Sequence, residues 1–307
     1  MVCDHFPVDE EAHVVELSNF SIVNGCQTTV SLTNAGAAAD DAEVLTRFIA
    51  APERLIDNII FFTNSQTPVR GWELRGQDKI QKRLQAEMAT GERPWYYSVR
   101  RGEARALSKE ERASFTHDGR FHVIPHDALG QVLAAFRSLP YVAYKDKGKI
   151  FSNNYEAVFP YDLTVEEALL AWRAGEAANR VVSVALHDAI EDGDDVETMM
   201  LKRGGKLFTV ATMAQILAER NGPNYVKNLK REVVTSKKTL ERLATYAQVA
   251  VVWYIQATRQ MVGGGGLQQL SSILRTQDSY PQLRRAINEQ WRVQSIAKQW
   301  VEALPKL

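Results

Sequence analysis

The chain has 307 residues and a mass of 34.5 kDa, with 37 basic and 37 acidic side chains and a formal net charge of +0. Its composition, 45% hydrophobic and 24% charged, excludes a disordered, collagen-like or coiled-coil protein and indicates one large globular domain or two smaller ones. Two cysteines, no leader-like opening and no apolar run near the ~20 residues of a membrane span lead us to expect a cytoplasmic protein without a disulfide framework or membrane association.

Residues 1–160 alternate between short strand and helix patterns. Short strands are expected within residues 1–20, and the dipeptide Asn24-Gly25 favours a turn that leads into a helix start at Thr28. Residues 44–49 have strand character, and Pro52 can open a helix. Further along, the pattern predicts an amphipathic helix over residues 74–88, strands over 95–99 and 121–124, and a helix over 127–137.

The pattern becomes almost continuously helical after residue 160. Thr164-Val165-Glu166-Glu167 has the spacing of a capping box and predicts a helix start, and the four glycines at residues 263–266 predict a break between two later helices. We therefore predict an α/β (α+β) N-terminal domain with a mixed sheet over residues 1–160, followed by an all-α C-terminal helical domain over residues 161–307. The helical half is the expected surface for a partner subunit or a second copy of the chain.

Charge is distributed unevenly along the helical half. Acidic side chains dominate residues 162–197, and basic side chains dominate residues 201–242. Adjacent blocks of opposite sign most often meet as solvated, salt-bridged helix faces, which is the simpler interpretation. The alternative is a basic strip that attracts phosphate groups.

Two polar loops are candidate ligand-binding segments. The first runs from an apolar strand through Asn24-Gly25 into a helix start, where free amides and the helix dipole suit an anion such as a phosphate. The second offers amides and hydroxyls after a predicted helix, and Asn and Gln present a donor and an acceptor together. The candidate ligand-binding residues are Asn24, Gly25, Gln27, Thr28, Asn64, Ser65, Gln66 and Thr67. Alternatively, these side chains only tie the loops to the backbone.

An aromatic and basic run is the candidate nucleic-acid interface. Tyr96 and Tyr97 could stack on unpaired bases while the guanidinium groups of Arg100 and Arg101 hold phosphates. Strand alternation would bury at least one of the two tyrosines, so a core role is the alternative.

No residue pattern defines a metal site, a cofactor or a catalytic set. His117, His122 and His126 are close in sequence, but their spacing fits no ligand motif on one helix, and we interpret them as ordinary hydrogen-bonding histidines. The acidic run at residues 191–195 lacks the spacing of a Ca²⁺ loop and is typical of a solvated linker. Neither a phosphate-binding loop followed by Lys-Ser/Thr nor a nucleophile elbow is present.

Four motifs together resemble one protein family. They are Asn24-Gly25-Cys26-Gln27-Thr28, Thr63-Asn64-Ser65-Gln66-Thr67-Pro68, Tyr96-Tyr97-Ser98-Val99-Arg100-Arg101-Gly102 and Phe151-Ser152-Asn153-Asn154-Tyr155-Glu156-Ala157-Val158-Phe159. In this order the series resembles the bacterial abortive infection phage resistance (AIPR) family over roughly residues 1–160. The resemblance is to the later portion of these proteins, which usually carry a further region before the matching segment. It implies a role in phage defence.

A weaker, fold-level similarity links the first loop to DGQHR-type and ParB/sulfiredoxin-like proteins. In those proteins a turn followed by a basic residue binds nucleotide phosphates. Thr28 stands where the basic residue would be, so the bidentate phosphate donor is missing. The similarity therefore implies a polar pocket and gives no support to triphosphate hydrolysis.

Three functions follow as hypotheses. The leading one is a phage-defence protein that binds a nucleotide or a nucleic acid through the polar Asn/Gln pocket. The enzymatic alternative is a metal-dependent nuclease or nucleotide hydrolase whose site is completed by another region or a partner. The third is a non-catalytic scaffold subunit.

Overall fold

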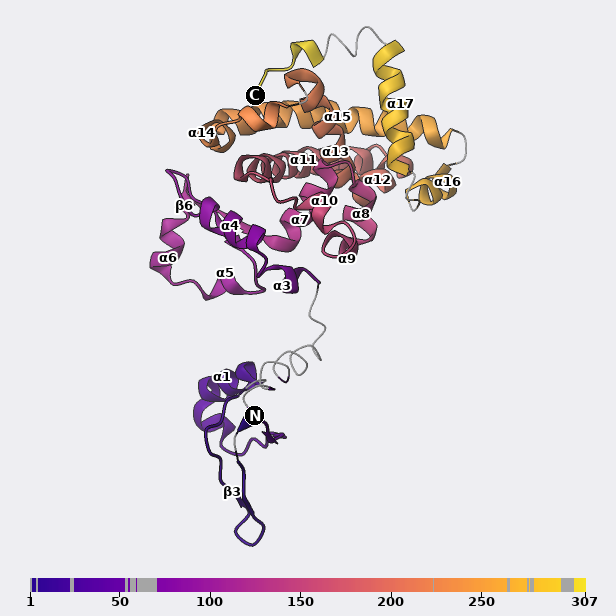
Figure 1. Ribbon diagram of the computed structural model, residues 1–307. Coiled ribbons are helices and arrows are strands. Elements are labelled where there is room, and N and C mark those ends of the chain that lie inside the picture. Colours follow the sequence, from indigo (N-terminus) through magenta and orange to yellow (C-terminus); the bar gives the residue numbers. More distant parts are fainter. Residues whose placement is uncertain are drawn as a thin grey trace. The chain divides into compact units, whose positions relative to one another are not determined.

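The computed structural model describes residues 2–3, 5–22, 25–52, 55, 59, 71–222, 224–263, 266–274, 276, 279–293 and 301–307. The chain folds as two compact units, Met1–Arg70 and Gly71–Leu307, which we call unit 1 and unit 2 (Figure 1). This division differs from the boundary expected near residue 160. The difference arises because residues 71–160 pack with the helices that follow them.

Where it is described, unit 1 consists mainly of short strands and helix α1. Strand β1 (Val2–Cys3) pairs in parallel with β4 (Ile49–Ala50), and β2 (Val8–Asp9) pairs with β3 (Val14–Val15) in an antiparallel hairpin. Helix α1 (Cys26–Ala35) continues into a 3-10 turn at Gly36–Ala39. The strand expected over residues 44–49 forms only at its end.

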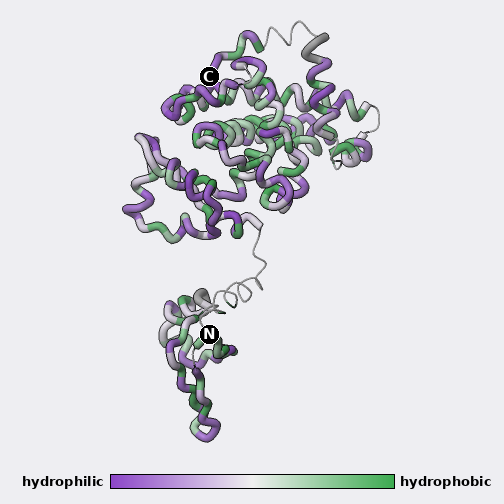
Figure 2. The backbone as a smooth tube through the Cα atoms, viewed as in Figure 1, coloured by the Kyte–Doolittle hydropathy of each residue, from purple (hydrophilic) through white to green (hydrophobic). Residues whose placement is uncertain are grey.

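The described part of unit 1 has few buried side chains. Its buried hydrophobic residues are Val2, Cys3 and Ala51. Its exposed large hydrophobic residues are Val8, Val14, Phe20, Ile22, Val30, Val44, Leu45 and Leu55. Hydrophobic and hydrophilic residues are interspersed along the described chain of unit 1 (Figure 2).

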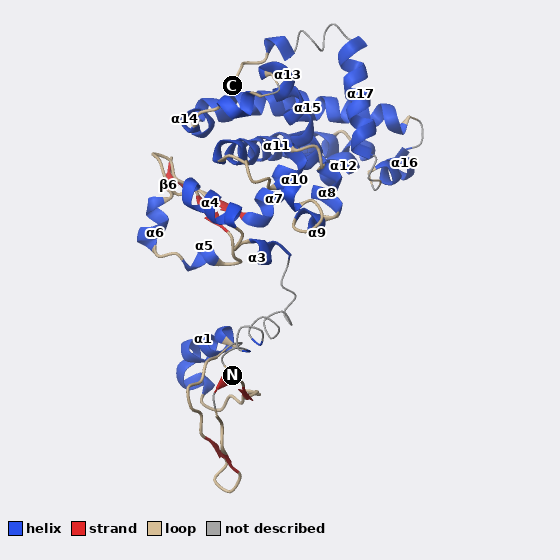
Figure 3. Ribbon diagram, viewed as in Figure 1, coloured by secondary structure: helices blue, strands red, loops and turns tan. Residues whose placement is uncertain are grey.

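Unit 2 begins with a layer of short helices and strands. The helices are α3 (Gly71–Arg75), α4 (Lys79–Met88), α5 (Glu103–Ala106) and α6 (Lys109–Ser114). Strand β5 (Tyr96–Ser98) pairs in parallel with β8 (Val123–Pro125), and β6 (Thr116–His117) forms a hairpin with β7 (Arg120–Phe121) (Figure 3). Over the described residues, the strands make four two-stranded sheets, two parallel and two antiparallel, instead of the expected mixed sheet.

The rest of unit 2 is helical, as the sequence predicts. The elements are α7 (His126–Phe136), α8 (Pro140–Lys145), α9 (Lys147–Ile150), α10 (Tyr155–Val158), α11 (Val165–Glu191), α12 (Asp195–Met200), the π-helical η2 (Leu201–Gly205), α13 (Lys206–Asn221), the 3-10 η3 (Tyr225–Asn228), α14 (Arg231–Thr235), α15 (Lys237–Val262), α16 (Gly266–Ile273) and α17 (Ser279–Val293). The predicted start at Thr164 is confirmed, because its Oγ1 accepts a hydrogen bond from the Glu167 amide at 3.2 Å.

The core of unit 2 lies where α7, α11, α13 and α15 pack against one another. Alanines and Gly175 line the buried side of α11. A Cβ on Gly175 would lie 2.9 Å from the Val132 methyl carbons of α7, so the two helices approach closely at this point. Among the described residues, no helix is both long and apolar enough to cross a membrane.

Candidate functional site

The first polar loop has the predicted turn-then-helix geometry where it is described. Gly25 has φ 111°, a left-handed conformation that favours glycine, and α1 follows directly without a side-chain hydrogen bond at its N-cap. Thr29 Oγ1 donates to the Gly25 carbonyl at 3.2 Å. Thr28 is exposed in the first turn of α1, whereas Asn24 and the side chain of Gln27 lie outside the description.

The second polar loop, with the candidate residues Asn64, Ser65, Gln66 and Thr67, lies outside the described residues. The convergence of the two loops on one pocket therefore stays a prediction.

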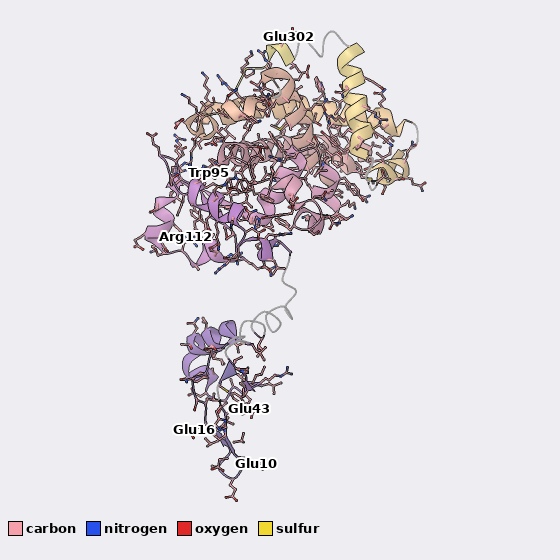
Figure 4. All side chains as sticks on the ribbon, viewed as in Figure 1. Glu10, Glu16, Glu43, Trp95, Arg112 and Glu302 are labelled. Carbon is pink, nitrogen blue, oxygen red and sulfur yellow. The ribbon has the colours of Figure 1, made fainter. Side chains whose placement is uncertain are left out.

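The aromatic run lies largely in the core. Tyr97 is 1% exposed, and its hydroxyl donates to Gln81 Oε1 at 2.6 Å, while Gln81 Nε2 donates to the Tyr155 hydroxyl at 3.0 Å. Trp95 is buried as well (Figure 4). The expectation that one of the two tyrosines is buried is confirmed. Tyr97 cannot stack on a base, which corrects the role expected of it.

Tyr96 is half-buried and packs edge-to-face on Phe115, with ring centroids 5.2 Å apart. Burial, together with the nearby negative charges of Glu103 and Glu111, raises the pKa of Tyr96 to about 12. Its hydroxyl is therefore neutral at any physiological pH, and one ring face is already in contact with the protein.

Three exposed arginines follow β5, and we call Arg100, Arg101 and Arg105 the arginine turn. Glu103 fixes the backbone of this segment, because its Oε2 accepts hydrogen bonds from the Val99 amide at 3.0 Å and the Arg100 amide at 3.2 Å. Arg101 Nε lies 3.7 Å from a Glu73 carboxylate oxygen. The three guanidinium groups are thus exposed to solvent, on a segment whose backbone is fixed by hydrogen bonds to Glu103.

His122 makes a hydrogen bond, as predicted, since its Nε2 lies 3.0 Å from the His117 carbonyl oxygen, and all three histidines also lie among aromatic rings. The His117 and His122 rings stack at 3.5 Å, and Trp95 meets His122 edge-on at 4.5 Å. Burial lowers the pKa of both histidines. His126 is fully buried, and burial lowers its pKa to about 4. Over the described ranges, no group of three or more His, Cys, Asp and Glu side chains could hold a metal ion.

The structure also shows a cluster that the sequence analysis missed. Arg173, Glu176 and Arg180 lie on α11, Lys206 begins α13, and Arg120 lies on β7. All four cations act electrostatically on the half-buried Glu176. We call these five residues the Glu176 cluster. The spacing of 173, 176 and 180 on one helix face was the sequence signal for its first half.

The two charged blocks of the helical half interact electrostatically, since Glu176 acts on Lys206 and Glu166 acts on Arg231. Within the part of the chain that the structure describes, no ion pair within 4 Å joins residues 162–197 to residues 201–242. Glu197 forms an ion pair with Arg259 of α15 at 2.8 Å, and Asp194 also forms an ion pair with Arg259. Glu167 forms an ion pair with Arg137 at 2.5 Å. In the described part of residues 201–242, no basic side chain has a carboxylate within 4 Å.

Comparison with known proteins identifies the family. No curated protein and no solved structure matches the chain. One family model, described as AIPR protein, matches residues 1–299, well beyond the roughly 160 residues over which the motifs resemble that family. The chain therefore belongs to the AIPR family, which implies a role in phage defence by abortive infection.

Proposed function

We propose that this AIPR protein acts in phage defence by binding nucleic acid through the arginine turn. The observation that carries the proposal is the fixed backbone around Glu103, which presents three guanidinium groups on the surface. In the described region, Arg100 and Arg105 have no carboxylate within 4 Å, and Arg101 has only the 3.7 Å contact with Glu73. These cations are available to neutralise phosphates.

Binding of this kind depends on salt and little on sequence. Each phosphate that an arginine neutralises releases a condensed counterion, so affinity falls steeply as the salt concentration rises. Because Tyr97 is buried and Tyr96 packs on Phe115, base stacking contributes little, and the contacts are to the phosphate backbone.

The test is fluorescence anisotropy with a labelled single-stranded oligonucleotide over a series of salt concentrations. The variant Arg100→Ala/Arg101→Ala should weaken binding and reduce the magnitude of the log–log salt slope by about 1 for each lost contact. Arg285→Ala, an exposed arginine on α17, is the matched control. An unchanged slope in the double variant, or binding that ignores salt, would contradict the proposal.

A second candidate is a nucleotide pocket at the first polar loop. The left-handed Gly25 at the N-cap of α1 favours it, because glycine has no side chain to cap the first amides and a helix start suits a phosphate. A nucleoside triphosphate should then raise the melting temperature, and Asn24→Ala/Gln27→Ala should remove that rise without unfolding the protein. No shift with the wild type would exclude this pocket.

A further inference from the structure

The β6–β7 hairpin is held by a stack of rings. The His117 imidazole of β6 lies parallel to the His122 imidazole, which follows β7, with ring centroids 3.5 Å apart and 5° between the planes. Trp95 meets both rings edge-on, with centroids 4.5 Å from His122 and 6.0 Å from His117. We call these three residues the histidine stack. Trp95 is 2% exposed, so the two imidazoles help to shield its indole from water.

His122 is the fixed member of the stack. Its amide donates to the Phe115 carbonyl at 2.9 Å, and its carbonyl accepts a hydrogen bond from the Tyr96 amide at 2.9 Å. Its ring Nε2 lies 3.0 Å from the His117 carbonyl oxygen. Because a carbonyl only accepts, Nε2 carries the ring proton and donates it to this bond. A further proton on His122 therefore goes to Nδ1.

His117 is the member whose ring is not hydrogen-bonded. Within the described part of the chain, both of its ring nitrogens are buried and neither makes a hydrogen bond. The Asp118 carboxylate lies 3.8 Å from Nδ1, but it forms an ion pair with Arg93 at 2.8 Å. An imidazolium has two N–H donors, so a proton on His117 would leave a charged ring without an acceptor at hydrogen-bond distance in the closed hairpin.

The surroundings of the two imidazoles disfavour their charged forms. Burial is the largest influence, and it lowers the pKa of both histidines. Asp118 favours a charge on either ring, whereas Arg93 opposes a charge on His117. A charge on His122 is opposed by Arg173 and by the other imidazole. When the hairpin opens, water surrounds the rings and each pKa returns to about 6.5, so proton uptake below that pH favours the open hairpin.

We propose that the histidine stack is a pH-sensitive switch that holds the β6–β7 hairpin closed at neutral pH and releases it on acidification. Two imidazolium rings with centroids 3.5 Å apart would repel each other strongly. Since backbone hydrogen bonds fix His122 on both sides, His117 is the ring that moves away, and the hairpin moves with it. The hairpin resists little, because β6 and β7 pair over two residues each. Its release uncovers Trp95.

Hydrogen–deuterium exchange of the full chain at pH 7.5 and pH 5.5, corrected for the intrinsic pH dependence of amide exchange, tests the proposal. For the peptide covering residues 115–122, the wild-type protection factor should fall by up to about tenfold per pH unit below 6.5 for each proton taken up. His117→Phe/His122→Phe keeps two rings in place without a titratable group, so its protection factor should stay constant. His187→Phe, at an exposed position on α11, is the matched control and should behave like the wild type.

An internal reference separates release of the hairpin from unfolding. Peptides from α7, which contains the buried His126, should remain protected at pH 5.5. Circular dichroism confirms that each variant is folded. An unchanged protection factor in the wild-type hairpin, an equal fall in the double variant, or a parallel fall in α7 would each overturn the proposal.

Nuclear magnetic resonance of the wild type gives a second test that does not depend on the folding of a variant. The imidazole resonances of His117 and His122 and the amide resonances of the hairpin should shift with one common midpoint below pH 6.5. Separate midpoints would show that the rings take up protons without releasing the hairpin, and they too would overturn the proposal.

Discussion

His126 is a titratable side chain enclosed by aromatic rings. It is 0% exposed, and the rings of Trp72, Tyr97 and Phe151 lie around it. Burial is the main reason that its pKa falls from 6.5 to about 4. The imidazole therefore stays neutral in the folded protein over a pH range in which it becomes charged in the unfolded chain.

This difference makes stability depend on pH. Because the unfolded state binds the proton first, we expect His126 to destabilise the fold progressively as the pH falls from about 6.5 to about 4, by a total of roughly 3 kcal/mol. Urea unfolding of His126→Phe at pH 7 and pH 4.5 should show a smaller loss of stability than the wild type. His187→Gln, at an exposed position on α11, should keep the wild-type loss. Equal losses in all three proteins would refute the expectation.

Tyr97 is one end of a buried polar chain in which Gln81 lies between the Tyr97 and Tyr155 hydroxyls. Tyr97→Phe leaves Gln81 Oε1 without its 2.6 Å donor inside the core, so we expect a loss of about 1–3 kcal/mol in the free energy of unfolding. Tyr161→Phe is the matched control, because Tyr161 is 87% exposed and should lose almost nothing. Chemical denaturation compares the two, and a loss of the same size in both would show that the buried hydrogen bond is not the cause.

At the scale of elements, the sequence predicts the helices better than it predicts the short strands or the way in which the helices pack. The cap at Thr164 identifies the start of α11, and the glycines at residues 263–266 coincide with the end of α15. The strands are harder to predict, because two-residue strands such as β6 and β7 carry almost no periodic pattern. Close packing such as that between Gly175 and Val132 depends on tertiary contacts that a single sequence does not show.

Helix α14 is joined to α4 through one side chain. Arg231 donates to the carbonyls of Glu87 at 2.6 Å and Met88 at 2.9 Å, at the C-terminal end of α4. Arg231→Met should therefore destabilise unit 2 by about 1.5–3 kcal/mol, the range of hydrogen bonds to charged groups. Lys230→Met, at the exposed neighbouring position, should change the denaturation midpoint very little. Matching midpoints for the two variants would contradict a role of Arg231 in joining these helices.

At the scale of the molecule, the sequence predicts the two structural classes but not their division. The sequence pattern changes near residue 160. Helix α7 precedes this change but packs on α11 and α13. The boundary between the two compact units therefore lies at residue 70, before the change of pattern. The candidate site residues also differ in how far they could be predicted from the sequence. Arg100 and Arg101 could be found from local sequence, whereas the Glu176 cluster needs residues from β7, α11 and α13.

Residues 71–307 should fold without unit 1. This segment contains most of the buried hydrophobic residues of the described chain, whereas unit 1 contributes Val2, Cys3 and Ala51. We expect the isolated segment to show a cooperative thermal transition at the melting temperature of the main transition of the full chain. Scanning calorimetry of both proteins makes the comparison. A broad, non-cooperative transition in the shorter protein would argue against its independence.

The contact between Arg231 and Glu87 also bears on the order of folding during synthesis. The two residues are 144 positions apart. The hydrogen bonds from Arg231 to the carbonyls at the end of α4 can therefore form only after α14 has emerged from the ribosome. Until then the early helices and strands of unit 2 can collapse but cannot reach their final packing. We expect ribosome-bound chains that end before residue 231 to be more sensitive to protease than the completed protein.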